Sequence, residues 1–409
     1  TMMHMPMTVQ MIMEHGLNVF PESRVGTFDG DSMSYTSYRE IAESAGRLAA
    51  ALRSLGITAG DRVATFSWNN TAHMEAYLGI PSMGAIMHTV NIRLSPEHIA
   101  YIINHAEDRV VLLDSSLVDV FAPVLPLLET VEHILLIGDG QLDTDIATLD
   151  YRAHLAEHEP LQDWPELDET SAAAVCYTSG TTGNPKGVVY SHRTTFVHSL
   201  ASRATDTFGI CERDRILLLP AMFHANAWGL PYSGWFSGSD FTLPGPHLQP
   251  EGIKGMIALV RPTISATVPT ILGVLLHADA EGLDMRCFRM LVCGGSAVPP
   301  AMIDAARERW GVPVLQGWGM TETSPLCALS HPPRDFEGAG ETEWRAKSGR
   351  PVPGVQVRVV SDDGAPLPHD GESVGELQLR GPWITKGYHQ GESADALTSD
   401  GWLRTGDVG

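Results

Sequence analysis

The sequence predicts an α/β fold with two helix-covered, mostly parallel sheets and a small β-barrel-like subdomain. Strand and helix patterns alternate through the first third of the chain, and a second alternating set begins at residue 172. From about residue 331 the pattern changes to short strands between Gly and Pro turns. Alternation of strands and helices is typical of parallel sheets covered by helices. We therefore expect a first α/β subdomain at 1–170, a second at 171–330 and a β subdomain at 331–409.

The first alternating set opens on an amphipathic helix over residues 36–55, whose apolar side chains recur on one stripe until Gly56 ends it. The other elements expected in this set are the strands 62–68, 109–114 and 133–137 and the helices 96–105 and 117–128. The acidic, Pro-interrupted stretch 141–170 is interpreted as an excursion or a linker.

The second set repeats the alternation and then gives way to isolated short strands. The strands expected here are 172–177, 215–219, 263–268, 289–293 and 312–316. Four helices are expected between them. One starts at 191, and the others span about 252–259, 269–278 and 299–310. Two short strands, 355–360 and 375–379, are expected in the β subdomain.

The chain is strongly acidic, with 27 basic and 49 acidic residues and a net charge of −22. Such a chain is repelled by nucleic acid and by anionic lipid, so an anionic ligand has to bind in a local pocket of backbone N–H groups, Lys and metal. The 43% share of apolar residues excludes a disordered or collagen-like chain. No apolar run is long enough to span a membrane.

The five cysteines are odd in number, widely spaced and without a C-x-x-C pair. Reduced thiols in a cytoplasmic protein explain them. The Met-rich start lacks the basic region and the cleavage site of a signal peptide. The sequence contains no H-E-x-x-H, and we find no metal-ligand spacing among its seventeen His.

The strongest local signal is the string Tyr177-Thr-Ser-Gly-Thr-Thr-Gly-Asn-Pro-Lys-Gly187, which an apolar strand precedes and a helical segment follows. Its glycines permit backbone conformations that other residues avoid, and free N–H groups in such a loop form an anion-binding nest. Hydroxyl donors and the Lys186 ammonium add charge-assisted hydrogen bonds of about 1.5–3 kcal/mol each. The string differs from the Walker pattern, because Lys186 follows a Pro and precedes a Gly.

We expect this string to hold a triphosphate; the alternative is a flexible surface loop rich in Ser, Thr and Gly. The residues expected to bind the phosphates are Thr178, Ser179, Gly180, Thr181, Thr182, Gly183 and Lys186.

The string resembles the phosphate loop of the adenylate-forming superfamily, which contains acyl-CoA synthetases, peptide-synthetase adenylation domains and luciferases. Residues 316–322 (Gln-Gly-Trp-Gly-Met-Thr-Glu) are similar to its adenine and Mg²⁺ motif, and residues 403–407 (Leu-Arg-Thr-Gly-Asp) to its ribose motif. Residues 220–229 (Pro-Ala-Met-Phe-His-Ala-Asn-Ala-Trp-Gly) resemble the segment that bounds the acyl pocket in fatty-acyl-CoA ligases. Residues 294–299 and 381–388 also fit, so the resemblance spans nearly the whole chain.

The resemblance implies ATP-dependent activation of a carboxylic acid to an acyl-AMP, followed by transfer of the acyl group to CoA. ATP, Mg²⁺ and CoA are the implied cofactors and co-substrates. Both reactants of the first step are anions, so the site has to neutralise charge and hold the attack in line. The acyl segment favours a medium- or long-chain fatty acid. The alternatives are an aryl acid, a short sulfur-containing acid, or a non-catalytic nucleotide-binding module.

The same resemblance assigns the phosphate and metal contacts. Glu322 would bind Mg²⁺ with Thr178 nearby, Thr321 would contact the α-phosphate, and Lys186 would hold the β- and γ-phosphates with the rest of the loop. Carboxylate, hydroxyl and phosphate oxygens suit a hard cation. The alternative for Glu322 is a carboxylate at a helix start or on the surface.

The nucleoside contacts follow from the motifs that resemble the adenine and ribose segments. Trp318 would stack on the adenine, and Asp407 would accept hydrogen bonds from both ribose hydroxyls. A core aromatic and a turn Asp after Gly406 are the alternatives for these two residues. The rest of the purine slot would be formed by Gly295, Ser296, Ala297, Gln316, Gly317, Gly319 and Met320.

The acyl end of the site is assigned in the same way. His224 would lie beside the acyl carboxylate and orient it, and Trp228 would line or gate the acyl tunnel. A structural His and a buried aromatic are the alternatives. Weaker lining candidates are Ala225, Gly229, Val268 and Thr270.

Members of the superfamily continue after the ribose motif into a hinge and a mobile C-terminal domain that supplies a Lys for adenylation. This chain ends at Gly409, and none of its four Lys matches that residue. We therefore expect a fragment without the C-terminal domain that keeps most of both pockets and is largely inactive. The expected partners are the carboxylic acid, ATP and CoA, without nucleic acid and without a membrane span, and with self-association as a homodimer.

Overall fold

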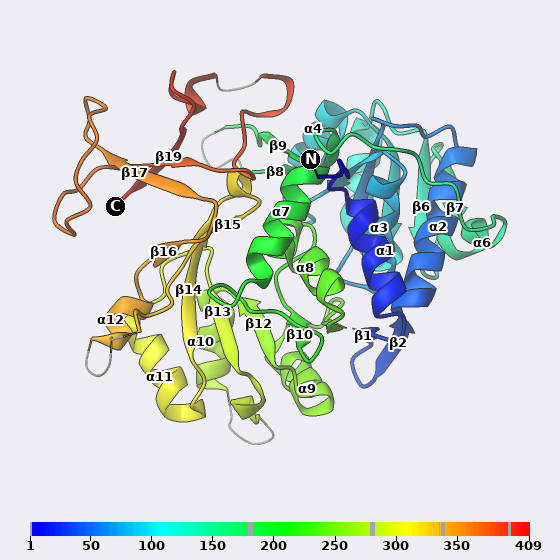
Figure 1. Cartoon of the computed structure of the whole chain (residues 1–409). Coiled ribbons are helices and arrows are strands. Elements are labelled where there is room, and N and C mark those ends of the chain that lie inside the picture. Colours follow the sequence, from blue (N-terminus) through cyan, green and yellow to red (C-terminus); the bar gives the residue numbers. More distant parts are fainter. Residues whose placement is uncertain (1, 179–182, 279–282, 335, 337–339, 392–393) are drawn as a thin grey trace.

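The computed structural model describes residues 2–178, 183–278, 283–334, 336, 340–391 and 394–409. Two large sheets and one small sheet are formed by these residues (Figure 1). The predicted fold class is thereby confirmed, and the small sheet lies within the range 331–409 where a β subdomain is expected.

The first large sheet has seven strands, all paired in parallel except for the last pair. In spatial order they are β7 (Ala147–Asp150), β6 (His133–Ile137), β5 (Asp108–Asp114), β3 (Arg62–Phe66), β4 (Ile86–Thr89), β8 (Ala172–Tyr177) and β9 (Gly187–Ser191). The antiparallel β8–β9 pair is a hairpin that brackets the phosphate string, with Tyr177 opposite Gly187.

The second large sheet has nine strands, parallel in its middle and antiparallel at both ends. In spatial order they are β16 (Arg350–Pro351), β15 (Leu326–Leu329), β14 (Val314–Gly319), β13 (Met290–Cys293), β12 (Ile264–Thr267), β10 (Arg215–Leu218), β11 (Asp240–Leu243), β1 (Arg24–Phe28) and β2 (Met33–Ser37). The small antiparallel sheet is formed by β17 (Gln356–Val360), β18 (Glu376–Arg380) and β19 (Leu403–Val408).

The helices form three layers around the two large sheets. The inner layer contains α1 (Val9–Val19), α2 (Tyr38–Ser54), α3 (Thr71–Ser82), α7 (His192–Arg203) and α8 (Leu230–Ser237), with α6 (Tyr151–Ala156) beside α2. The outer layer of the seven-stranded sheet contains α4 (Pro96–Ala106) and α5 (Val118–Phe121). The outer layer of the nine-stranded sheet contains α9 (Pro250–Val260), α10 (Pro269–His277) and α11 (Pro300–Trp310), which α12 (Glu341–Arg345) contacts.

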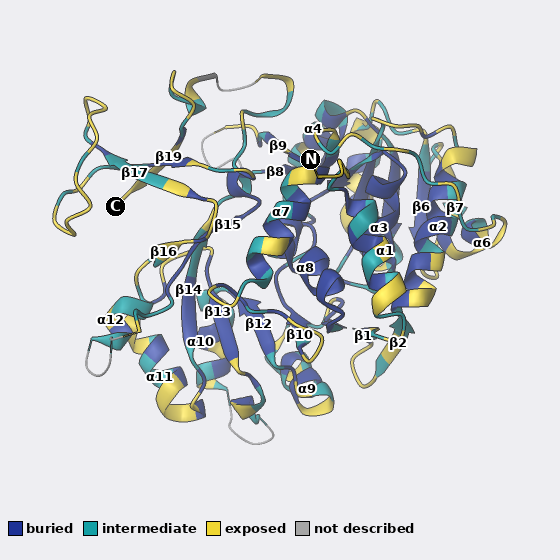
Figure 2. Cartoon of the chain, in the orientation of Figure 1, coloured by how far each residue is buried: buried dark blue, intermediate teal, exposed yellow. Residues whose placement is uncertain are grey.

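Alternation along the strands explains this layering. On β3, Val63 packs into the inner core that both sheets share, whereas Ala64 packs into the outer core under α4. On β10, Leu218 belongs to the inner core and Leu217 to the core under α9 and α10. Successive side chains on a strand point to opposite faces, so both faces of each sheet are buried. Figure 2 shows the central strands buried and the small sheet more exposed.

Helix α2 begins where its sequence provides a capping box. The Ser37 hydroxyl accepts a hydrogen bond from the N–H of Glu40, and the Glu40 carboxylate accepts one from the N–H of Ser37 at 2.7 Å. Such caps satisfy N–H groups that the first turn leaves free and contribute about 1 kcal/mol. The predicted helix over 36–55 is therefore confirmed to within two residues at each end.

Two expected elements differ from the structure. The helix expected over 117–128 is instead a 3₁₀ turn (Ser115–Leu117), the short α5 and a second 3₁₀ stretch (Ala122–Leu127), because Pro123 and Pro126 have no N–H to donate. The stretch 141–170, expected as a linker, contains β7 and α6.

Both large sheets take strands from either side of the expected boundary between residues 170 and 171. The β8–β9 hairpin completes the seven-stranded sheet, whereas β1 and β2 extend the nine-stranded sheet. The division into three units stays a prediction about folding units. Among the described residues no helix combines the length and apolarity that crossing a bilayer requires, and all five cysteines are free.

Replacing Gly79 with Ala is expected to lower the free energy of unfolding by about 1–3 kcal/mol. Gly79 on α3 faces α2, and a Cβ at this position would lie 2.6 Å from the carbonyl oxygen of Ala45. This clash can be relieved only if α2 and α3 move apart. Urea unfolding measures the change.

Gly255 on α9 provides the matched control, because a Cβ there would meet Phe28 at an ordinary 3.4 Å. Gly255→Ala should stabilise the chain by up to about 1 kcal/mol through its higher helix propensity. Equal effects of the two substitutions would contradict the close approach of α2 and α3.

Candidate active site

The base of the phosphate string is closed by hydrogen bonds between its two ends. The N–H of Thr178 donates to the carbonyl of Lys186 at 2.9 Å, and the N–H of Lys186 donates to Thr178 Oγ1 at 3.1 Å. Gly187 is required at the start of β9, because a Cβ there would lie 2.9 Å from the Cβ of His389. Of the expected phosphate ligands, Ser179, Gly180, Thr181 and Thr182 lie outside the described residues, and Gly183 is exposed.

A cavity of about 350 Å³ connects the loop after β10 with the end of β14. Ten of the residues predicted from the sequence lie around it. They are His224, Ala225, Trp228, Val268, Gly295, Gly317, Trp318, Gly319, Met320 and Thr321. Most of the remaining wall is apolar, with Phe208, Leu219, Phe223, Leu248, Ile271 and Leu326 among its members. The acyl segment and the adenine segment therefore share one space.

Several predicted residues lie outside this lining. Gln316 is buried, where its Oε1 accepts a hydrogen bond from the N–H of Val298 at 2.7 Å. Thr270, Ser296 and Ala297 are exposed beyond it. Glu322 and Asp407 also do not line the cavity and are described below.

Trp228 is presented by a run of left-handed residues from Ala225 to Gly229. The φ angles are 42° at Ala225, 50° at Asn226, 48° at Ala227 and 60° at Trp228, each of which costs about 1–2 kcal/mol for a residue with a side chain. The buried side chain of Asn226 fixes the run, since its Oδ1 accepts hydrogen bonds from Cys176 Sγ at 3.2 Å and Thr89 Oγ1 at 3.5 Å.

Glycines on both sides make room for this turn. A Cβ at Gly229 would lie 2.6 Å from Cε1 of His198, and a Cβ at Gly294 would lie 3.4 Å from Cη2 of Trp228. The Trp228 ring thus lies against a glycine backbone at the end of β13, between the expected acyl and adenine regions.

The loop that leads to His224 is held by Asn69, which the sequence did not single out. The buried Asn69 amide donates to the carbonyls of Leu218 and Pro220, both at 2.8 Å, and accepts from the N–H of Met222 at 2.7 Å. The only sequence signal is a polar Asn directly after a predicted strand. Its partners are about 150 residues away, so no local pattern reveals them.

His224 follows this loop and faces the open cavity rather than the packed core. The cavity walls still desolvate its ring, and burial first and the charge of Arg93 second lower its pKa. The imidazole is therefore neutral at neutral pH and can orient a carboxylate by donating a hydrogen bond. Arg93, also missed from the sequence, lines the same cavity with its guanidinium 5.9 Å from the Phe223 ring centroid.

Three charged or polar groups converge beside the phosphate string. Glu322 lies in a 3₁₀ turn (Thr321–Thr323) and is only 7% exposed. The Tyr388 hydroxyl donates to Glu322 Oε1 at 2.6 Å, and the Lys186 ammonium lies 5.3 Å from the Tyr388 ring centroid. The sequence placed Tyr388 in a matching segment but gave it no role.

The expected adenine and ribose contacts also lie side by side. Trp318, on β14, donates its indole N–H to Asp407 Oδ2 on β19 at 3.0 Å. The hydrogen bond occupies one carboxylate oxygen and brings residues 89 positions apart into one place.

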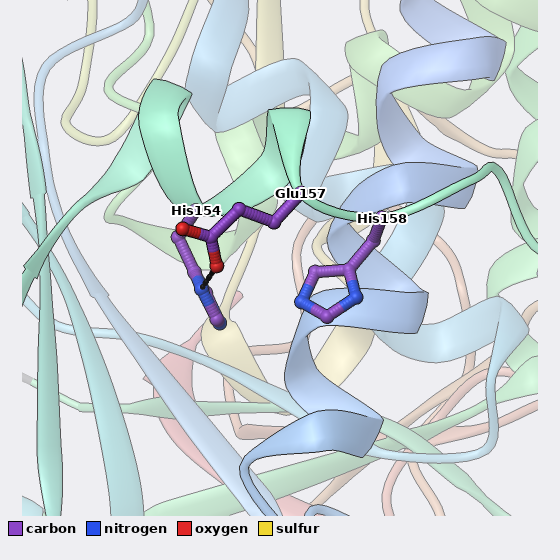
Figure 3. A group of neighbouring side chains, drawn as sticks. All are labelled: His154, Glu157 and His158. Atoms are coloured by element: carbon purple, nitrogen blue, oxygen red, sulfur yellow. Dashed lines mark hydrogen bonds and ion pairs between the residues drawn. The ribbon is translucent and has the colours of Figure 1, made fainter.

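The expectation that no His residues have the spacing of metal ligands is wrong for one group. His154, Glu157 and His158, on and just after α6, have ligand atoms within 4.8 Å of one another. Figure 3 shows the Glu157 carboxylate reaching the His154 ring, with Oε2 and Nδ1 3.4 Å apart. None of the three lines the cavity. Two imidazoles also suit transition metals better than Mg²⁺, so the group does not bear on the expected Mg²⁺ contacts.

Comparison with known proteins finds one family and several similar CoA ligases. The profile of the family described as AMP-binding enzyme matches residues 13–389. A 3-methylmercaptopropionyl-CoA ligase from Ruegeria pomeroyi is 41% identical over 100% of this chain and 77% of its own length. A long-chain-fatty-acid–CoA ligase from Thermus thermophilus is 43% identical over 91% of this chain and 69% of its own length.

Among solved structures, an anthranilate CoA ligase in complex with anthranoyl-AMP superimposes with a TM-score of 0.89. The match covers 99% of this chain and 76% of that chain at 24% identity. At this identity the likeness concerns the fold.

Asn69→Ala is expected to lower the free energy of unfolding by about 1–3 kcal/mol, because two carbonyls and one N–H of the buried loop lose their partner. The Met222 amide should also exchange its hydrogen faster. Urea unfolding and hydrogen exchange measure the two effects.

Asn104 on α4 is the control, since its amide also bridges two backbone groups but is exposed. Asn104→Ala should cost less, as water replaces the lost bonds, and should leave the exchange of the Met222 amide unchanged. Unaltered Met222 exchange in Asn69→Ala would contradict the role of Asn69.

Acid is expected to destabilise the packing beneath Gly229 through His198. Burial lowers the pKa of His198 from 6.5 to about 4, and its Nε2 accepts a hydrogen bond from the N–H of Leu326 at 3.3 Å. Folding thus favours the neutral ring. This contribution to stability is present above pH 6.5 and is lost as the pH falls toward about 4.

Urea unfolding at about pH 7 and about pH 4.5 tests this expectation against His198→Gln, whose amide oxygen can still accept from Leu326. The wild-type chain should lose about 2–3 kcal/mol more than the variant between the two conditions. Equal losses would show that His198 is not the group that responds.

Proposed function

The chain belongs to the AMP-binding enzyme family, and we propose that it activates a linear, largely apolar carboxylic acid with ATP and passes the acyl group to CoA. The coarser statement, an AMP-forming acyl-CoA ligase, is supported by the family match and by the named relatives together. The proposal adds the class of acid and the residues that bind the substrates.

The observation that carries the proposal is the shared cavity. Its wall includes Phe223, His224 and Trp228 from the loop after β10 as well as residues 317–321 at and just after the end of β14. An acyl-adenylate is an apolar chain joined to a nucleotide, and it needs such a continuous space. Proximity and orientation are worth several kcal/mol when both reactants are held in one site.

The nucleotide end follows from the groups around the β8–β9 hairpin. Lys186 and Thr178, paired at the base of the phosphate string, would bind the β- and γ-phosphates. Thr321, on the cavity wall, would contact the α-phosphate. Trp318 would stack on the adenine, and the second oxygen of Asp407 would accept from the ribose, since Oδ2 already accepts from the indole.

The donor set at Glu322 fits Mg²⁺. Tyr388 occupies Oε1, and no other described residue donates to the carboxylate, so Oε2 is available to a cation. A carboxylate oxygen and the hydroxyl of Thr178 are the hard ligands that Mg²⁺ prefers. When bound, Mg²⁺ would supply positive charge to the phosphates; Glu322 and Thr178 would hold it.

The acyl end supports a linear apolar acid. Neutral His224 would donate a hydrogen bond to the acid carboxylate, with the Arg93 charge at the same cavity. Trp228 and Val268 would line the acyl chain. We favour a medium- or long-chain fatty acid, as the acyl segment predicts.

A short thioether acid is the second candidate, because the Ruegeria pomeroyi relative is a 3-methylmercaptopropionyl-CoA ligase and aligns over the whole chain.

The cytoplasmic location and the homodimer expected from the sequence are likewise part of the proposal.

Binding of non-hydrolysable acyl-sulfamoyl adenosines tests the proposal without requiring turnover. We expect dodecanoyl and 3-methylmercaptopropionyl analogues to bind at least about tenfold more tightly than a benzoyl analogue, because the cavity wall is mostly apolar and a flexible chain can follow it. Calorimetry measures the affinities, and acid-dependent ATP–pyrophosphate exchange measures adenylation with the same acids.

Tighter binding of the dodecanoyl analogue favours the fatty acid, and tighter binding of the thioether analogue favours the second candidate. Preference for the benzoyl analogue would contradict the proposed acid class. Binding of ATP without binding of any acyl analogue would favour the non-catalytic module.

A further inference from the structure

The segment from Gly381 to Gln390 connects the small sheet to both large sheets. The indole N–H of Trp383 donates to the carbonyl of Leu326 on β15 at 3.0 Å. At the other end, Gln390 Nε2 donates to the carbonyl of His105 on α4 at 3.1 Å. Tyr388 therefore lies on a backbone that is fixed at two distant points, and its position is not that of a free loop.

Tyr388 is the side chain that links the two charged groups of the nucleotide site. Its hydroxyl lies 2.6 Å from Glu322 Oε1, and its ring carries the Lys186 ammonium 5.3 Å from the centroid. The N–H of Thr385 donates to the backbone carbonyl of Glu322 at 2.9 Å, so the same segment holds both the backbone and the side chain of this residue.

The hydroxyl is the donor in this contact. A carboxylate oxygen can only accept a hydrogen bond, so the phenol of Tyr388 donates its proton in the 2.6 Å contact with Glu322 Oε1. A hydrogen bond to a charged acceptor is stronger than a neutral one. The bond fixes Oε1, and no further described residue donates to the carboxylate, which leaves Oε2 to another ligand.

The Tyr388 ring also determines where the Lys186 ammonium lies. Lys186 and Glu322 carry opposite charges and are buried or half-buried, yet the described residues form no ion pair between them. The ammonium instead lies against the Tyr388 ring, an attraction of about 0.5–2 kcal/mol. If the two groups met directly, each would neutralise the other.

We propose that Tyr388 is a positioning residue of the nucleotide site, whose hydroxyl holds the Glu322 carboxylate toward a cation and whose ring keeps Lys186 from pairing with that carboxylate. The inference rests on the proposed function, in which Glu322 binds Mg²⁺ and Lys186 binds phosphate. Partners of a metal ligand typically change metal affinity by about 10–100-fold when they are removed.

The test is the Mg²⁺ dependence of ATP binding by the 409-residue chain, measured by calorimetry at a series of Mg²⁺ concentrations. Tyr388→Phe keeps the ring and removes the hydroxyl, and it should raise the Mg²⁺ concentration at half-saturation about tenfold. Its affinity for ATP without Mg²⁺ should stay within twofold of wild type, since Lys186 keeps its aromatic partner. Tyr388→Ala removes both features and should raise the Mg²⁺ requirement further.

Tyr151→Phe is the matched control. Tyr151 is also buried and donates to a carboxylate, Glu75 Oε2, at 2.7 Å, but neither residue belongs to the candidate nucleotide site. The substitution should cost stability while leaving the Mg²⁺ half-saturation within twofold of wild type. A Tyr388→Phe half-saturation within twofold of wild type would overturn the inference.

A double-mutant cycle separates a specific role from general loosening. In the Glu322→Gln background, Tyr388→Phe should change the Mg²⁺ dependence no further, because Tyr388 acts through the carboxylate. Additive shifts would overturn the inference. Absence of any Mg²⁺-dependent ATP binding by the wild-type chain would instead overturn the proposed function, so the two failures are distinguishable.

Discussion

Two buried asparagine side chains join the two large sheets at the place where the cavity lies. Asn69 follows β3 of the seven-stranded sheet and holds the loop after β10 of the nine-stranded sheet. Asn226, further along that loop, accepts from Cys176 on β8 and Thr89 on β4. A buried polar group without a partner costs about 1–3 kcal/mol. The loop therefore cannot shift relative to the seven-stranded sheet without leaving such groups unpaired, and the cavity inherits its shape from both sheets.

The left-handed turn depends on these bonds. Four successive non-glycine residues in this conformation are unfavourable, and they persist because the surroundings fix them. Asn226 supplies the anchor, and Gly229 and Gly294 supply space that a Cβ would fill. The turn directs Trp228 into the cavity, between the proposed acyl and nucleotide regions. Relaxing the turn to an ordinary helix would move this ring away from β13, so the position of the ring depends on the strained backbone.

The sequence could predict what adjacent residues determine. Strand β8, the start of α7 after Ser191 and the phosphate string between them follow from local patterns, and so do β3, β5, β6, β10, β12, β13 and β14, whereas the other strands of the two large sheets were not predicted. The prediction of a helix over 117–128 was wrong, because it gave the apolar spacing more weight than Pro123 and Pro126, which interrupt a helix. Among the site residues, those in contiguous strings, such as His224 and Thr321, could be named.

The residues that could not be predicted act through contacts far along the chain. Asn69 binds a loop some 150 residues away, and Tyr388 binds a carboxylate 66 positions earlier. A lone Asn or Tyr has many structural uses, and only the fold decides among them. The same reason explains why the sheet boundaries were missed, because nothing local to β1 shows that it pairs with β11 and carries β2 into the nine-stranded sheet.

The charge distribution explains how so acidic a chain can serve an anionic ligand. Charges beyond about 8 Å are largely screened at physiological ionic strength, so the net −22 matters less than the few groups at the site. Lys186 and Arg93 favour an anion there, whereas Glu322 opposes one. If the loop binds phosphate as proposed, a cation between the phosphates and the buried Glu322 carboxylate would offset their repulsion, which is strong between unscreened anions in a low-dielectric setting. The direct Lys186–Glu322 pair would remove that repulsion but would also consume the cation that the phosphates need. In the proposed site, the Tyr388 ring would keep the two groups apart, so that the carboxylate keeps its charge for a metal and the ammonium keeps its charge for phosphate.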